Sequence, residues 1–410
     1  MRKKLLAVAG AGLASVVAIG GTALADPTAG SPNQTGPYSL VGVGSDTVQD
    51  VWNQLALDMD ATTHNQIASY NANSGGNTLP SNIKASGCSG LPRPNGSGSG
   101  RAALISSLNN TTSTAITLPD GTTTTANYNG CIDFSRSSSL SLGSTTTPLT
   151  YVPFADDAVS YAVTRTSTVP RTLSIIDLQH IYQCDPNYVG TGSNNYAGGS
   201  GPGNNPTGFT WVPVLPQAGS GTRSFWETQM GITDANVVNG TYPCIANGAY
   251  TKNSVSHVAE EHTADFLLDN WLVPFSIPQY LNQTTGLVAD RRGNSVLGTV
   301  AGTGDLLVSN SGNGTAYGSL TEALRPPASF NFQRHVYDVV PREFIDSSFT
   351  TGCGGGGQPA CYTPGATATL YGNVFGPSGS VCTDTTALNK YHFLPIAAGR
   401  VCGDVTDHTP

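Results

Sequence analysis

The sequence is poor in charged residues, and most of its charges are negative. Only 11% of the 410 residues are charged, with 26 acidic and 18 basic side chains. Three of the basic residues lie in the first 25, which leaves 15 against 26, or a formal charge of −11, for the rest of the chain. The sequence contains no tract of basic residues that could attract nucleic acid over a long range. Nucleic acid is therefore excluded as a partner.

Long apolar runs and familiar catalytic motifs are also missing. After residue 25 no stretch approaches the roughly 18 apolar residues of a membrane span. Neither the serine-hydrolase pentapeptide G-x-S-x-G nor the phosphate-loop motif G-x-x-x-x-G-K-[ST] occurs. His257 and His262 are five residues apart, which is the wrong spacing for a helical zinc motif. We expect them, with Glu260 and Glu261, to form a solvated helix surface, and we expect no metal, cofactor or catalysis.

The first 25 residues have the features of a signal peptide. A basic start, MRKK, precedes an apolar stretch and the A-x-A site of residues 23–25. No cysteine lies at the cleavage site, since the first is Cys88, so we expect a secreted chain without a lipid anchor. Residues 26–38 are rich in Pro, Gly and Thr, which is typical of a flexible leader.

The cysteines contain no C-x-x-C pair, and their number, eight, is even. In an exported chain this predicts disulfides rather than a metal site. Sequence spacing alone does not fix the pairing. We expect Cys88–Cys131, Cys184–Cys244, Cys353–Cys361 and Cys382–Cys402.

A short apolar strand, a Gly/Ser turn and a helix follow one another three times. The first unit has a strand near residues 40–43, the turn Gly44–Thr47 and a helix over about 48–60. The second places Gly96–Gly100 before helix-spaced apolar residues, and the third places Gly219–Thr222 in QAGSGTRSFW. This alternation predicts an α/β fold with mainly parallel sheets.

The glycines in these turns favour an anion site over simple helix capping. Helix N-termini carry unpaired N–H groups and partial positive charge, and glycine lets a ligand approach the backbone closely. In parallel sheets such turns meet at the carboxyl ends of the strands. Capping by Asp46, Thr47 or Ser220 remains the alternative interpretation.

The order of GVGSDT, NGSGSG, IDFSRSS, GSGTR, PFSIPQYLNQ and RHVYDVVP resembles the phosphate-binding, substrate-binding proteins of ABC transporters. It resembles their exported actinobacterial-like relatives more closely, over about residues 40–341. The resemblance implies a type II periplasmic-binding-protein fold, with two α/β lobes joined by two crossover strands. Residues 149–163 look like the first crossover, and 271–280 lie near the second. The expected organisation is signal peptide 1–25, leader 26–38, first lobe 39–153 and 276–345, second lobe 154–275, and a disulfide-stapled extension 346–410.

The resemblance also implies which residues hold the anion. Two departures from the family pattern bear on the ligand: Ser138 stands where the family has an aspartate, and Pro216 where it has an arginine. Arg136 and Arg223 are the available replacements for that arginine. The expected ligand-binding residues are Ser45, Asp46, Thr47, Ser97, Arg136, Ser138, Ser220, Gly221, Thr222 and Arg223.

The expected function is a secreted, monomeric solute-binding protein for inorganic phosphate or a similar small oxyanion, with an ABC-transporter permease as a candidate partner. Beside a bound anion, Asp46 would favour phosphate over sulfate, because phosphate has a proton to donate to it. Two alternatives stay open. One is a secreted phosphoesterase or other hydrolase with Asp46 as nucleophile or base, and the other is a surface protein whose cleft is vestigial.

Overall fold

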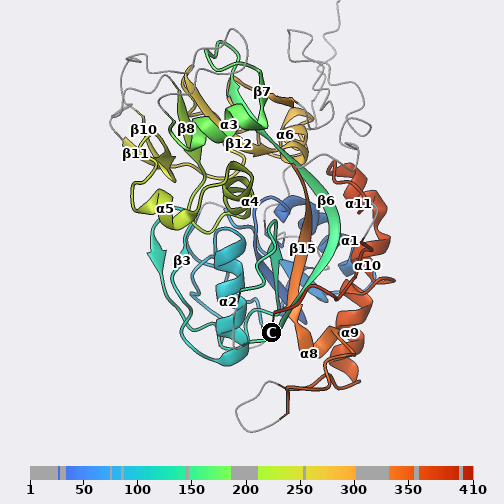
Figure 1. Ribbon diagram of the computed structural model, residues 1–410. Helices are drawn as coiled ribbons and strands as arrows, with labels where there is room; N and C mark the ends of the chain where they lie inside the picture. The colour runs from blue at the N-terminus through green and yellow to red at the C-terminus, as the bar shows by residue number, and fades with distance from the viewer. Residues whose placement is uncertain are drawn as a thin grey trace, which may run out of the picture.

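The computed structural model combines one large mixed sheet with helices on both of its faces (Figure 1). The signal-peptide prediction falls outside the described residues, as do residues 28–33 of the predicted leader. The structure describes residues 26–27, 34–73, 76–84, 87–143, 147–185, 211–252, 255–301, 332–354, 360–396 and 400–409.

The large sheet has nine strands in the order β2-β1-β5-β15-β6-β12-β8-β9, and β13 pairs with β6 beside this path. Three further pairs, β3·β4, β7·β14 and β10·β11, form small two-stranded sheets. The strands of the large sheet are β1 (Leu40–Gly44), β2 (Ile67–Ser69), β5 (Phe134–Ser137), β6 (Leu149–Thr164), β8 (Val212–Leu215), β9 (Ala246–Asn247), β12 (Trp271–Ser276), β13 (Ser295–Leu297) and β15 (Gln333–Pro341). The small strands are β3 (Ile116–Thr117), β4 (Thr123–Thr124), β7 (Thr172–Ser174), β10 (Ala249–Lys252), β11 (Val255–Val258) and β14 (Thr299–Ala301).

The long strands β6 and β15 run antiparallel through both halves of the molecule (Figure 1). The end of β15 pairs with β5 in the first lobe, whereas the end of β6 pairs with β12 and β13 in the second. Within each lobe the neighbouring strands β2-β1-β5 and β12-β8-β9 are parallel. Two α/β lobes joined by two crossing strands are the expected type II periplasmic-binding-protein fold, which is confirmed.

The helices that follow the strands form where the sequence predicted them. In α1 the buried residues Val51, Trp52, Leu55 and Met59 recur at helical spacing, so one face packs on the sheet. The Ser220 hydroxyl caps α4 by accepting the N–H of Arg223, which confirms the capping interpretation for that residue. The helices of the two lobes are α1 (Gln49–Asp60), α2 (Ser97–Asn109), α3 (Ile175–Tyr182), α4 (Gly221–Met230), α5 (Asp234–Val238) and α6 (Ile277–Thr284).

The hydrophobic cores place one segment differently from the sequence expectation. Ile277, Tyr280, Val296 and Val300 pack in the core of the second lobe, around Trp226. The described residues 277–301 therefore pack with the second lobe instead of the first. The second crossing strand is β15, and 271–280 forms β12 and the start of α6.

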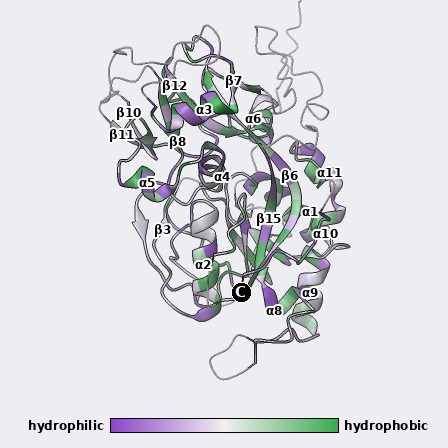
Figure 2. Ribbon diagram, in the orientation of Figure 1, coloured by the Kyte–Doolittle hydropathy of each residue, from purple (hydrophilic) through white to green (hydrophobic). Residues whose placement is uncertain are grey.

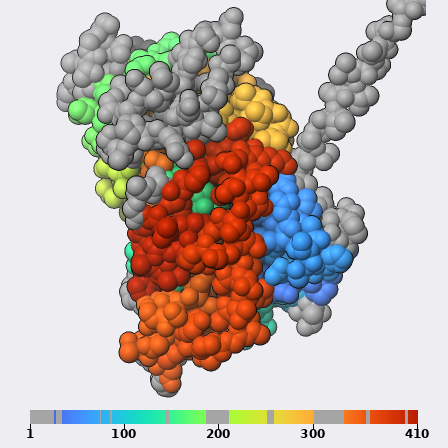
Figure 3. All heavy atoms as spheres, turned by 90° about the vertical axis from the view of Figure 1, so that its right-hand side faces the viewer, coloured from blue at the N-terminus to red at the C-terminus, as the bar shows by residue number. Residues whose placement is uncertain are grey.

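The C-terminal extension packs on the first lobe, as the sequence predicted. Figure 3 shows it as a layer that covers one side of this lobe beside the N-terminal segment. The ring centroid of Phe375 lies 5.2 Å from that of Phe134 and 6.0 Å from that of Trp52. Polar and apolar residues are interspersed along its helices, since only one face is buried (Figure 2). The helices of the extension are α9 (Ala366–Phe375), α10 (Ser380–Thr383) and α11 (Thr385–Lys390), and the short α8 (Arg342–Ile345) links β15 to them.

All four expected disulfides are present: Cys88–Cys131, Cys184–Cys244, Cys353–Cys361 and Cys382–Cys402. The first two tie loops within the first and the second lobe, and the other two close loops of the extension. Among the described residues, no helix has both the length and the hydropathy needed to cross a membrane.

Candidate functional site

Five hydroxyl side chains meet where loops of the two lobes come together. Ser45 and Thr47 follow β1, and Ser138 follows β5. Ser97 opens α2, and Thr222 lies in the first turn of α4. The Oγ of Ser138 lies 3.1 Å from that of Ser45, 3.2 Å from Oγ1 of Thr47 and 3.4 Å from Oγ of Ser97. Across the lobes, 3.3 Å separates the Oγ1 atoms of Thr47 and Thr222. We call these five side chains the hydroxyl cradle.

Glycine allows the lobes to touch at the cradle. The N–H of Gly98 donates to the carbonyl of Gly219 at 2.9 Å, so the turn before α4 lies directly against α2. A Cβ added to Gly221 would collide with the hydroxyls of Ser97 and Ser138. The glycines therefore allow the two lobes to approach each other closely, in addition to allowing the chain to turn.

A guanidinium from a crossing strand completes the cradle. Arg334 of β15 is 7% exposed and lies opposite Asp157 of β6. Its Nε and Nη2 donate to Oδ2 of Asp157 at 2.8 and 2.6 Å. Nη2 also lies 2.9 Å from Oγ1 of Thr222 and 3.5 Å from Oγ1 of Thr47. Its Nη1 is buried without a hydrogen-bond partner in the described part of the chain. Nη1 of Arg334 is thus a charged donor that lies beside the hydroxyls and is available to an acceptor.

The position of Arg334 is fixed from behind. Oδ1 of Asp157 accepts the hydroxyl of Ser276 at 2.7 Å, and Ser276 caps α6. The guanidinium carbon also lies 5.3 Å from the ring centroid of Phe225. A buried ion pair with these additional contacts holds one geometry, because separating it would leave charges without compensation.

Acidic side chains line the other side of the cradle. Glu261 is 3% exposed; its Oε1 accepts the N–H of Thr222 at 3.3 Å, and its Oε2 accepts the hydroxyl of Thr47 at 3.1 Å. Asp46 is 6% exposed, and its Oδ2 lies 3.3 Å from Nδ1 of His262. The helix α1 has no side-chain cap bond, so Asp46 is not a cap.

Burial changes the protonation of this acidic side. It raises the pKa of Asp46 to about 6 and that of Glu261 to about 8, because a buried carboxylate loses its hydration. The two carboxyl groups share a hydrogen bond, which raises the pKa of Glu261 and lowers that of Asp46. Glu261 is therefore the proton-bearing partner at neutral pH. Burial lowers the pKa of His262 to about 4, so this imidazole is neutral.

The same three residues form a candidate metal centre. Asp46, Glu261 and His262 each offer one ligand atom, and these atoms lie within 4.8 Å of one another. Oxygen and imidazole ligands suit zinc and similar divalent ions. The sequence expectation of a solvated helix surface is wrong for Glu260, Glu261 and His262, which are buried in the loop after β11.

Of the ten residues predicted to bind ligand, the structure brings eight to the cleft and two elsewhere. Arg136 is completely buried behind the first turn, where it donates to Ser69 Oγ at 2.7 Å and to Tyr70 O at 2.7 Å. Its Nε also donates to the carbonyl of Ser45 at 3.2 Å, so it supports the cradle loop from behind. The eight at the cleft are Ser45, Asp46, Thr47, Ser97, Ser138, Ser220, Gly221 and Thr222.

Arg223 also points away from the cradle. It pairs with Glu227 at 2.9 Å and with Asp234 at 2.6 Å, and it donates to the carbonyl of Pro216 at 2.9 Å. These contacts tie α4 to its own lobe. The expected replacement of the family's arginine by Arg136 or Arg223 is therefore corrected, and Arg334 is the guanidinium at the cradle.

The residues that sequence reasoning missed had a readable signal. Asp157 lies in an apolar strand, and Arg334 lies in the other crossing strand, where an unpaired charge would be costly. Opposite charges within two apolar strands point to a buried pair. Glu261 had no such signal, because its burial depends on the fold of a loop.

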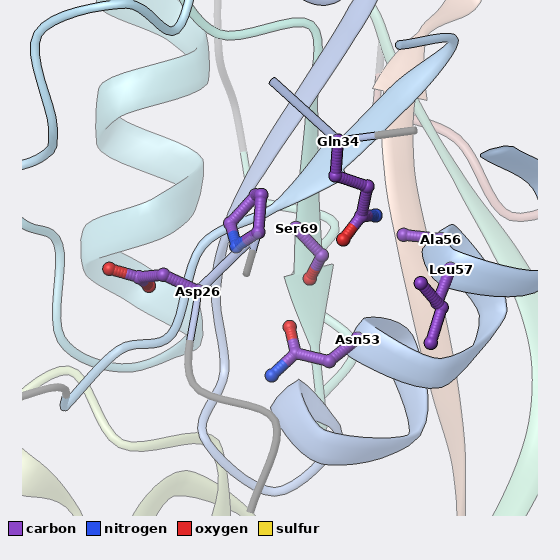
Figure 4. Close-up of a pocket in the computed structure, with 7 residues that line it drawn as sticks. Asp26, Gln34, Asn53, Ala56, Leu57 and Ser69 are labelled. Atoms are coloured by element: carbon purple, nitrogen blue, oxygen red, sulfur yellow. The ribbon is translucent and has the colours of Figure 1, made fainter. Parts of the chain in front are cut away.

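A small pocket elsewhere in the first lobe is not the candidate site. It lies between α1 and the N-terminal segment (Figure 4). Asp26, at its edge, forms an ion pair with Arg93 at 2.8 Å, so the cation nearest to this acid is already neutralised. The pocket is lined by Asp26, Pro27, Gln34, Asn53, Ala56, Leu57 and Ser69.

Comparison with known proteins gives distant structural likenesses only. No family model and no curated protein matches the sequence. A phosphate transport receptor from Vibrio cholerae matches at 13% identity and a TM-score of 0.42, over 87% of this chain and 100% of that one. A putative phosphate transporter substrate-binding protein from Clostridium perfringens matches at 12% and 0.43, over 87% and 99%. A human phosphate-binding apolipoprotein matches at 13% and 0.40, over 88% and 91%. The chain is thus similar to phosphate-binding proteins, but at these TM-scores nothing about its site follows from them.

Proposed function

We propose that this protein is a secreted solute-binding protein that holds phosphate, or a similar small oxyanion, between its two lobes without chemical conversion. One observation carries the proposal. Hydroxyls from both lobes converge on a buried guanidinium, Arg334, whose Nη1 has no partner among the described residues. A buried donor without an acceptor is costly, and an anion oxygen would supply that acceptor.

Magnitudes support the need for Arg334 in this proposal. One helix N-terminus contributes roughly 0.3–1 kcal/mol to anion binding. Micromolar affinity corresponds to about −8 kcal/mol. The α4 N-terminus therefore falls far short, and charge-assisted hydrogen bonds of roughly 1.5–3 kcal/mol each must supply much of the rest.

The acidic side of the cradle favours an oxyanion that carries a proton. Asp46 and Glu261 are acceptors, or share one proton, so a fully deprotonated anion would face unfavourable contacts there. Phosphate keeps a proton near neutral pH, whereas sulfate has none. We therefore propose phosphate over sulfate, with Asp46 as the acceptor of the phosphate proton.

Calorimetric titration of the chain from Asp26 onward tests this function. We expect phosphate to bind at micromolar or lower dissociation constant and sulfate to bind at least tenfold more weakly. A thermal melt with and without phosphate provides an independent readout, because a ligand that binds only the folded state raises the melting temperature. Absence of both heat and thermal shift with phosphate would contradict the proposal and favour a vestigial cleft.

The location and partners belong to the same proposal. Cleavage after Ala25 would release a secreted monomer, and an ABC-transporter permease is the candidate partner. Intact mass of the secreted chain checks the cleavage site, since a mature form beginning at Asp26 is expected.

A hydrolase on the same scaffold is the second candidate function. It is favoured by the cluster of Asp46, Glu261 and His262, because buried carboxyl groups with raised pKa values are common at catalytic sites. In that case a divalent ion would be held by these residues, and a phosphate ester would take the place of phosphate. Turnover of a chromogenic phosphate ester with added zinc or manganese, lost in Asp46→Asn, would support the hydrolase over the binding protein.

A further inference from the structure

The carboxyl group of Glu261 takes the very donors that an oxyanion in the cradle would need. It accepts a helix N-terminal N–H from Thr222 and a hydroxyl from Thr47, and it also bonds the hydroxyl of Ser220. Backbone N–H groups at helix N-termini and hydroxyl groups are the usual donors to bound anions. An acidic side chain of the protein itself thus lies where a ligand oxyanion would lie.

The loop that delivers Glu261 is firmly held. Its backbone N–H donates to Oε1 of Gln217 at 3.2 Å, and the N–H of Gln217 donates to the carbonyl of Ala259 at 2.9 Å. The amide of Gln217 also donates to Oδ1 of Asn95 at 3.1 Å, which connects the loop to the first lobe. This network places the carboxyl group in the cradle through built contacts on both sides of the cleft.

A second observation indicates that the cradle has more donor capacity than Glu261 uses. Nη1 of Arg334 is buried and unpartnered in the described part of the chain, although its Nη2 contacts the same two threonines that hold Glu261. One carboxyl group has two oxygens, whereas a tetrahedral oxyanion has four. The site is therefore only partly satisfied by the side chain within it.

We infer that the carboxyl group of Glu261 is a tethered ligand of the hydroxyl cradle, which an incoming oxyanion must displace from Thr47 and Thr222. The competition with phosphate rests on the proposed function, but the occupancy of the cradle by a carboxyl group does not. Such an internal competitor lowers the affinity for the external anion, because its donors must be released before the ligand can use them. Glu261 is in this sense a residue that sets the ligand concentration to which the protein responds.

Glu260 provides a matched control. It is the adjacent residue, it is 8% exposed, and its carboxylate oxygens accept the amide of Asn95 at 3.0 Å each. None of its described contacts is with Thr47 or Thr222. Removal of its side chain deletes a carboxyl group of the same size but leaves the cradle donors engaged with Glu261.

Chemical rescue by acetate tests the inference directly. In Glu261→Ala, acetate restores the deleted carboxylate and should raise the melting temperature, with little effect on the parent or on Glu260→Ala. Phosphate should bind Glu261→Ala at least tenfold more tightly than the parent, the size expected when a charged hydrogen bond no longer competes. Acetate should also weaken phosphate binding in this variant.

The outcomes separate the two proposals. Acetate that leaves the melting temperature of Glu261→Ala unchanged, or phosphate affinity no higher than in the parent, overturns the inference. Acetate rescue without phosphate binding in the parent or either alanine variant supports the tethered ligand and contradicts the proposed function. If Glu261→Ala does not fold, Glu261→Gln replaces it, and phosphate must then bind this variant more tightly than the parent.

Discussion

The two sides of the cleft are buried to a similar degree but differ in chemistry. On one side, the hydroxyls and Arg334 form hydrogen bonds with one another, and only Nη1 of Arg334 has no acceptor among the described residues of this side. On the other, Asp46, Glu261 and His262 crowd acceptors together, and burial raises the pKa values of both acids. Burial of neutral hydroxyls costs little once they are hydrogen-bonded, whereas a buried carboxylate must find a proton or a cation.

This difference means that the cleft is not a uniformly positive site that would suit any anion. If the cleft holds an anion as proposed, the donor side would attract it, and the acidic side would favour an anion that carries a proton. A ligand that both accepts and donates hydrogen bonds fits the combination better than a pure acceptor. Selectivity and affinity therefore have different structural sources within one site, and each can be altered separately.

Removal of the guanidinium from the donor side should have the largest effect on affinity. We expect the double variant Arg334→Gln with Asp157→Asn to weaken phosphate binding by more than about 100-fold, since a charge-assisted bond of about 3 kcal/mol is lost. The double change keeps the buried pair neutral and so avoids an uncompensated charge, which would destabilise the fold. Calorimetry measures the affinity, and circular dichroism checks folding. Affinity within threefold of the parent would remove Arg334 from the site.

The acidic side should make the folded protein less stable as the pH rises. The pKa of Glu261 is about 8 in the folded state against a model value of 4.5, so the folded state holds its proton longer than the unfolded state does. The free energy of unfolding therefore decreases between about pH 4.5 and pH 8. We expect Glu261→Gln to flatten this decrease by an amount on the order of a few kcal/mol, measured by urea unfolding at several pH values. Glu260→Gln gives the control for a neighbouring acid, and a parent that becomes more stable across this range would contradict the assigned direction.

Conversion of Asp46 to an amide should narrow the discrimination between anions. In Asp46→Asn the amide can donate a hydrogen bond to sulfate. The ionised carboxylate of the parent can only accept hydrogen bonds. We expect the phosphate-to-sulfate affinity ratio to fall roughly tenfold, the effect of about one hydrogen bond. Competition calorimetry with both anions measures the ratio. An unchanged ratio would show that Asp46 takes no part in selection.

Substitution of an arginine outside the cradle should have the smallest effect. Arg223 pairs with Glu227 and Asp234 on the far side of α4, so Arg223→Ala should change phosphate affinity by less than about threefold. Its loss should instead lower the melting temperature, because Glu227 would keep a buried carboxylate without its cation. If Arg223→Ala folds like the parent but binds phosphate much more weakly, Arg223 belongs to the binding site and the assignment of Arg334 is weakened.

Most of the fold could be predicted from local sequence. The spacing of Val51, Trp52 and Leu55 predicts α1, and the resemblance to substrate-binding proteins implies the crossing strand β6. The turns before α2 and α4 carry glycine and serine, so their approach to one another could be expected from the chemistry of helix N-termini. These features depend on neighbours in the chain, and this is why a single sequence reveals them.

The candidate site could be predicted only in part. Ser45, Thr47, Ser97, Ser138 and Thr222 were within reach, because each lies at the end of a predicted strand or the start of a predicted helix. Which arginine enters the cleft could not be predicted, because this depends on which side chains β5, α4 and β15 direct into it. Arg334 and Glu261 lie 73 residues apart in sequence and meet only through Thr47 and Thr222. Their proximity therefore arises only from the tertiary structure.

The C-terminal extension affects how the cleft can move. Backbone hydrogen bonds from Leu394, Gly403, Asp407 and Thr409 fasten it along the first half of β6, up to Asp156. The next residue, Asp157, holds Arg334. The extension therefore stiffens β6 up to the residue before this ion pair, and we expect any bending between the lobes to occur beyond Asp156.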